Sequence, residues 1–188
     1  HHHPQMELTL VERGSGTLFI GDSMMRFQAP DLVLIGPDLP HFWHMRQASA
    51  GFALQFHAGA EHPVWQFPES AALRLLWEEA RRGVRFSGAA VQVSAVALLE
   101  AAEHGGGMRR LAAFMRILSA LAEADVGDRH VLASMTFAPP ESQLAYRGLQ
   151  KAIKRIFNHF HEDLPFESIR RESGMSKATF ERHFKRHT

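Results

Sequence analysis

The sequence predicts an α+β protein in which an N-terminal antiparallel β-barrel is followed by helices. Short apolar runs recur at intervals of about 10 to 15 residues up to residue 67. A helical period replaces them from residue 68, and the last quarter of the chain is basic and helical. Every apolar run is far shorter than the roughly 18 residues that span a bilayer, so no membrane partner is expected. The chain has no cysteine, which excludes disulfides and thiolate sites.

Residues 1–67 form the predicted barrel. Apolar runs at 6–11, 17–20, 31–35 and 52–56 are separated by turns rich in glycine, aspartate and proline. Short strands with such turns between them, and with no intervening helix, are typical of an antiparallel barrel or sandwich.

Residues 68–135 are predicted to be helical. A stripe of apolar residues at helical spacing follows Pro68, and two more cover 91–102 and 111–122, with glycines between them. The region is rich in alanine and leucine, which suits helix-on-helix packing. Two interpretations stay open: the helices cover the barrel, or they form an antiparallel pair that makes the protein a homodimer.

Residues 136–145 are a predicted linker, because Pro139 and Pro140 cannot continue a helix. The charge changes at this point. Residues 1–140 carry 11 Lys+Arg against 14 Asp+Glu, a net of −3, whereas residues 141–188 carry 10 against 6, a net of +4. A basic segment after an acidic body predicts an anionic partner, most commonly nucleic acid, with a solvated helical surface as the alternative.

Residues 146–188 carry the pattern of two short helices around a tight turn. A helix over 166–173 is followed by Gly174, which suits the left-handed conformation that ends a helix. Ser176 is placed to cap a second, basic helix over 177–187. A short helix, a glycine turn and a basic second helix form the architecture that presents a helix to the major groove of DNA.

The G-M-S turn that begins at Gly174, with F-x-R-x-F-K-R over 180–186, resembles the first helix-turn-helix of the AraC family of bacterial transcription regulators. The guanidinium of Arg182 could donate two hydrogen bonds to a guanine edge. The resemblance implies that the DNA-binding residues are Lys177, Ala178, Glu181, Arg182 and Lys185.

The DNA-binding domain of that family holds two helix-turn-helix units. Thr188 follows the first unit directly, so we expect a truncated chain. Full affinity for double-stranded DNA is then expected to need the second unit.

The first 60 residues resemble a cupin barrel. The spacing H-x-H-x3-E-x6-G, which begins at His1 and ends at Gly14, is that of the first cupin motif. Residues 30–41 match the second motif more loosely and keep its final histidine, His41. Regulators of the AraC family often carry such a barrel as a sensor, so the two resemblances agree.

Four side chains of these motifs are candidate metal ligands. His1, His3 and Glu7 share one face of a strand because they stand at alternating positions, and His41 could reach them from a neighbouring strand. Three imidazoles and a carboxylate suit a divalent metal such as Fe, Mn, Ni or Zn. The alternative is a barrel that binds an organic ligand and requires no cofactor.

Glu7, His41 and Trp43 are the expected contacts of a small-molecule effector. The indole of Trp43, beside polar groups, could stack on a sugar ring, and sugars are a ligand class that this type of regulator often senses. The alternative for Trp43 is an ordinary core residue.

The sequence therefore predicts a cytoplasmic, ligand-responsive transcription regulator and not an enzyme. The alternative is a metal-dependent cupin enzyme, an isomerase or a dioxygenase, that uses His1, His3, Glu7 and His41. We favour the regulator because a free-standing cupin enzyme has no use for a basic recognition helix.

Overall fold

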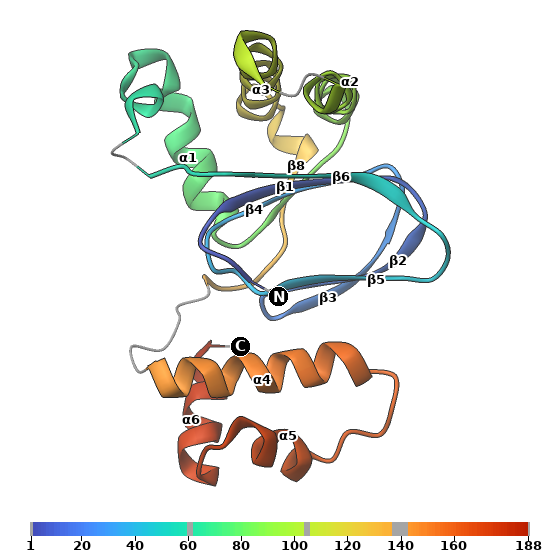
Figure 1. Ribbon diagram of the computed structural model, residues 1–188, viewed down its shortest axis with the longest axis vertical. Helices are drawn as coiled ribbons and strands as arrows, with labels where there is room; N and C mark the ends of the chain where they lie inside the picture. The colour runs from blue at the N-terminus through green and yellow to red at the C-terminus, as the bar shows by residue number, and fades with distance from the viewer. Residues whose placement is uncertain (1, 60–61, 104–105, 137–142, 188) are drawn as a thin grey trace.

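Two antiparallel β-sheets lie face to face, with one group of helices outside each sheet (Figure 1). The computed structural model describes residues 2–59, 62–103, 106–136 and 143–187. One sheet has the strand order β6-β1-β4-β7-β8: Ala50–Phe56, Met6–Arg13, Asp31–Ile35, Val84–Phe86 and Arg129–Val131. The other has the order β3-β2-β5: Ser23–Gln28, Ser15–Ile20 and His41–Met45.

The predicted α+β class and the antiparallel, cupin-like arrangement are confirmed, but the barrel is not closed, because the strands form two separate hydrogen-bonded ladders within the described residues. The sheets nevertheless enclose a common interior, as the barrel was expected to. The five-stranded sheet also extends beyond residue 67, since β7 and β8 come from the region predicted to be helical. Both are three-residue strands, too short to show alternation, and β7 forms by pairing with β4.

Three helices cover the outer face of the five-stranded sheet (Figure 1). They coincide with the three helical stripes of the sequence, and short 3-10 turns flank them. The helices are α1 Ala71–Ala80, α2 Ala89–Glu103 and α3 Gly107–Ala122, and the turns are η1 Pro63–Gln66, η2 Pro68–Ser70 and η3 Val126–Asp128.

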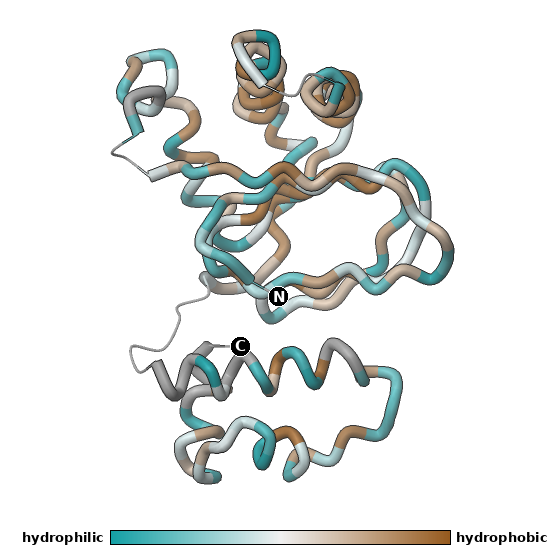
Figure 2. Tube along the Cα trace, viewed as in Figure 1, coloured by the Kyte–Doolittle hydropathy of each residue, from teal (hydrophilic) through white to brown (hydrophobic). Residues whose placement is uncertain are grey.

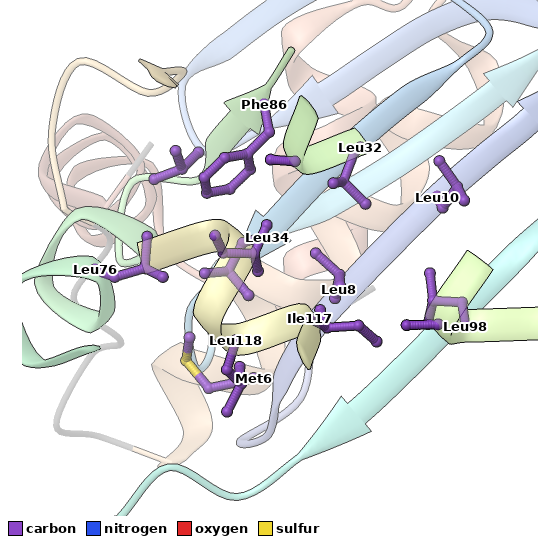
Figure 3. Packing of buried hydrophobic residues seen from close by; sticks show 14 of the residues in the cluster. Met6, Leu8, Leu10, Leu32, Leu34, Leu76, Phe86, Leu98, Ile117 and Leu118 are labelled. Carbon is purple, nitrogen blue, oxygen red and sulfur yellow. The ribbon is translucent and has the colours of Figure 1, made fainter. Parts of the chain in front are cut away.

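The main core lies between these helices and the sheet (Figure 3). Figure 2 shows apolar residues concentrated in α2, α3 and the strands beneath them. The residues that meet there include Leu8, Leu10, Leu32 and Leu34 from the sheet and Leu76, Leu98, Ile117 and Leu118 from the helices. A second core lies between the two sheets and contains Val11, Leu18, Ile20, Phe27, Val33 and Ile35.

The C-terminal unit consists of α4 Gln143–His159, α5 Phe166–Ser173 and α6 Lys177–His187. Gly174 ends α5 in the left-handed conformation, with φ 70°. The Ser176 hydroxyl accepts a hydrogen bond from the backbone N–H of Thr179, 3.3 Å away, and so caps α6. Ala152, Ile169 and Phe180 form a small core of this unit.

Two neighbouring leucines of α1 test the main core. Leu76 is fully buried and Leu75 is 62% exposed. We expect Leu76→Ala to lower the free energy of unfolding by about 2–5 kcal/mol, because it removes buried methyl groups and leaves a cavity. Leu75→Ala is the control and should change it by less than about 0.5 kcal/mol. Urea unfolding followed by circular dichroism measures both, and equal effects would contradict this packing.

Candidate functional site

A buried carboxylate, Glu7, is the centre of the polar cluster between the sheets. Glu7 lies on β1 and is only 4% exposed. The Thr9 hydroxyl donates to its Oε1 at 2.7 Å, and the Gln55 amide of β6 donates to its Oε2 at 2.9 Å. His3 Nε2 lies 2.9 Å from the same Oε2. Alternation on β1 and β6 aims these side chains at the interior, since Glu7 and Gln55 stand opposite each other in the ladder.

These partners keep Glu7 ionised. Burial alone raises the pKa of a carboxyl group, but the hydrogen bonds from Gln55 and Thr9 outweigh it here. The nearby imidazoles of His41 and His3 act in the same direction. The pKa of Glu7 is therefore lowered, and its carboxylate is ionised at neutral pH.

The two histidines of the cluster are oriented by backbone carbonyls. His41 Nδ1 lies 2.8 Å from the Leu39 carbonyl, and His3 Nδ1 lies 3.1 Å from the Gln5 carbonyl. A carbonyl oxygen only accepts, so each Nδ1 is the donor. Burial lowers the pKa of His41 to about 4, so its ring is neutral at pH 7. His41 Nε2, 3.7 Å from Glu7 Oε1, then carries a lone pair.

This geometry fits a cation. Ligating atoms of His3, Glu7 and His41 all lie within 4.8 Å of one another. The Glu7 carboxylate only accepts, so His3 Nε2 donates to it in this structure. A bound metal would replace that proton, accept lone pairs from both imidazoles and offset the charge of the carboxylate. Histidines that bind metals usually donate their second ring N–H to a carbonyl or carboxylate, as both do here. His1, the fourth predicted ligand, lies outside the described residues.

Trp43 lies beside the cluster on β5. Its ring centroid is 6.0 Å from that of His41, in an edge-to-face arrangement. Its Nε1 is buried and makes no well-aligned hydrogen bond among the described residues, although the indole lies close enough to Asp31 to help oppose the effect of burial, which raises the pKa of that carboxyl group. A buried donor of this kind suits a ligand that brings an acceptor oxygen.

The sequence did not reveal a second polar pair, Asp31 and Arg85. Arg85 Nε of β7 lies 2.7 Å from the Asp31 carboxylate of β4, and Asp31 is 4% exposed. Burial raises the pKa of Asp31, although Arg85 opposes the shift. In the sequence, Asp31 is a charge at the start of an apolar strand, and Arg85 stands between Val84 and Phe86. Neither feature points to the other, because only the pairing of β4 with β7 brings the two residues together.

The predicted DNA-binding residues form a separate exposed surface. Lys177, Ala178, Glu181 and Arg182 are all exposed on α6. Their spacing puts them on one side of the helix, and the buried Phe180 faces the small core on another. The side chain of Lys185 lies outside the described residues, although its backbone belongs to α6.

Two face-to-face sheets with a carboxylate, two imidazoles and a half-buried indole between them form the architecture of a ligand-binding domain. The model of the AraC-like ligand-binding domain family matches residues 1–177, and the chain belongs to this family. Domains of this family are typically regulatory rather than catalytic. Neither the curated proteins nor the solved structures gave a match. Within the described residues, every helix is too short or too polar to cross a bilayer.

Proposed function

We propose that the chain is a transcription regulator that binds a small molecule between its sheets and DNA through α6. This proposal rests on the combination of two sites in one chain. The interior of an AraC-like ligand-binding domain holds a polar cluster, and a unit packed against the same domain exposes Lys177 and Arg182.

The effector we propose is a polyhydroxylated molecule such as a sugar. The Glu7 carboxylate could accept hydrogen bonds from hydroxyl groups, and the Trp43 indole could both donate from Nε1 and stack on a ring. The neutral His41 Nε2 could accept a further hydrogen bond. The apolar residues around these groups are typical of small-molecule sites, which combine apolar walls with a few polar groups.

The DNA contact is proposed on charge and exposure. Residues 141–188 carry a net charge of +4, whereas the rest of the chain carries −3. Both α4 and α6 carry exposed basic residues, namely Lys151, Lys154, Lys177 and Arg182. An excess of exposed basic residues in one unit is the electrostatic signature of nucleic-acid binding.

Arg182→Ala tests this contact. A duplex selected by the chain from a random pool at low salt provides the probe, and fluorescence anisotropy gives the affinity. We expect Arg182→Ala to weaken binding about tenfold or more, because a bidentate contact to guanine is lost. Lys177→Ala should lower the slope of log affinity against log salt concentration by about one, because one phosphate contact and its released counterion are lost.

Arg109→Ala is the matched control. Arg109 is an exposed arginine of α3, which covers the five-stranded sheet and does not belong to the C-terminal unit. Arg109→Ala should leave affinity unchanged. Selection of no duplex, or equal affinity of Arg182→Ala and the unsubstituted chain, would overturn the assignment of α6 to DNA.

We also propose that α2 mediates homodimerisation. Val93, Val96 and Leu99 are 42%, 58% and 51% exposed and recur every third residue, so they form an apolar stripe on the outer side of α2. The opposite side of α2 is buried against the sheet and α3. A second copy of the same stripe is a self-complementary occupant, as a two-fold interface requires.

Val96→Glu tests the dimer. A buried, unpaired carboxylate at the centre of the interface opposes association. We expect the unsubstituted chain to elute as a dimer in size-exclusion chromatography with light scattering, and Val96→Glu to elute as a monomer. The control is Leu75→Glu on α1, which places the same charge at a residue 62% exposed and should preserve the dimer.

A second candidate function is metal binding at His3, Glu7 and His41. The convergence of their ligating atoms within 4.8 Å specifically favours it. When bound, a divalent metal would supply a Lewis acid to an oxygen ligand of the effector. The same site is what a cupin isomerase or dioxygenase would need. Turnover of a candidate substrate by the metal-loaded chain, lost in Glu7→Gln, would favour the enzyme over the regulator.

Calorimetric titration with Zn²⁺ tests the metal site. We expect one high-affinity site in the chain and a loss of at least about tenfold in Glu7→Gln, which removes an anionic ligand at constant shape. His2→Ala is the control because His2 is outside the cluster. An affinity that falls in His2→Ala and not in Glu7→Gln would assign the metal to the N-terminal histidines and contradict an interior site.

A further inference from the structure

The outer face of the three-stranded sheet is aromatic. Alternation on β2 and β5 directs Leu18, Ile20, His41 and Trp43 to the interior and the residues between them outwards. The outward residues include Phe19 and Phe42, which stand opposite each other in the ladder with ring centroids 6.3 Å apart. His44 continues this face, 6.4 Å from Phe42.

Phe160, just beyond the end of α4, packs on this face. Its ring lies edge-to-face on Phe19, with centroids 4.7 Å apart, and on His44, with centroids 4.9 Å apart. The neighbouring His161 stacks on His44 at 6.5 Å. These are favourable distances and orientations for aromatic pairs. Phe19 is consequently only 6% exposed, although it stands on the outer side of its sheet.

A second group of contacts joins the middle of α4 and the end of α6 to the three-stranded sheet. Ile153 and Ile156 of α4 and Phe184 of α6 line a cleft of about 240 Å³ together with Phe19 and Met24 of the sheet. Ile153 and Phe184 also pack against the core between the sheets. In Figure 1, α4 runs along the sheet beneath β3 and β5. Both α4 and α6 therefore contact the sensor.

We propose that Phe19, Phe42 and His44 form the docking surface that holds the C-terminal unit, with Phe160 as its anchor. The occupant is residues 143–187 of the same chain. The docking leaves Lys177, Ala178, Glu181 and Arg182 exposed, so it orients the DNA-reading surface and does not cover it.

The docking surface lies on the reverse of the effector site. On β5, His41 and Trp43 face the interior, whereas Phe42 and His44 face the C-terminal unit. Successive residues of a strand rise about 3.3 Å, so the two surfaces are one peptide apart. A ligand that displaces Trp43 acts on the same stretch of backbone that positions His44. Strand β5 thereby couples effector binding to the orientation of the unit, a role that rests on the proposed function.

Distance measurement between two spin labels tests the docking. The chain has no cysteine, so Gln28→Cys on β3 and Lys154→Cys on α4, both exposed, give a unique labelled pair. Dilution with unlabelled chain removes distances between copies. We expect one narrow distance distribution, and its loss in Phe160→Asp, which places a charge against Phe19. A distribution that is broad at the outset, or that stays narrow in Phe160→Asp, overturns the docking.

Lys151→Asp is the matched control, because it introduces the same carboxylate at an exposed residue of α4. Lys151→Asp should keep the narrow distance distribution. Its loss would show that an added carboxylate anywhere on the unit disturbs the distance, and would contradict the role of Phe160 as the anchor. Circular dichroism verifies that each variant is folded. Phe160→Ala replaces Phe160→Asp if the latter does not fold, with the same expected loss.

The coupling through β5 is tested with the same labels. Trp43→Ala removes an interior side chain of β5, and Met25→Ala removes one of β3. We expect the narrow distribution to shift or broaden in Trp43→Ala and to persist in Met25→Ala. No change in Trp43→Ala, or equal changes in both, overturns the coupling; Trp43→Phe replaces an unfolded Trp43→Ala. The readout needs neither effector nor DNA, so failure of the coupling is distinct from failure of the proposed function.

Discussion

Strand β4 is buried on both faces, and this constraint arranges the layers around it. All five residues from Asp31 to Ile35 are buried. Leu32 and Leu34 require an apolar layer on one side, which α1–α3 provide, and Val33 and Ile35 require one on the other, which the second sheet provides. Because burial of such side chains stabilises by about 1.5–3 kcal/mol each, neither layer can be absent. The polar cluster is therefore enclosed between sheets that the core already holds together.

The three-stranded sheet also needs an apolar layer over its outer face. Phe19 is an aromatic side chain on the far side of that sheet, and the C-terminal unit covers it. A residue that a free sensor would expose to water thus becomes a contact with the unit that carries α6. The proposed effector residues and the proposed docking residues alternate along β5, so one strand contributes to both faces of the sheet.

Much of the sensor could be predicted from the sequence, because local patterns encode it. Alternation on β1 located Glu7 in the interior, and the loose motif that ends at His41 located its partner. The sequence did not show that the barrel is open, because strand pairing depends on long-range register, which periodicity does not report. The Asp31–Arg85 pair was missed for a related reason: its members are joined only by the pairing of β4 with a three-residue strand. The docking of Phe160 on Phe19 likewise depends on tertiary packing.

If the sensor and the C-terminal unit form one body through the outer face of the three-stranded sheet, they tumble together in solution. Backbone ¹⁵N relaxation on the full chain measures this most directly, since it gives a rotational correlation time for each helix and strand. We expect the same correlation time for the amides of α4–α6 as for those of β2, β5 and α2. A distinctly shorter correlation time for α4–α6 would show a unit that tumbles independently and would contradict the docking.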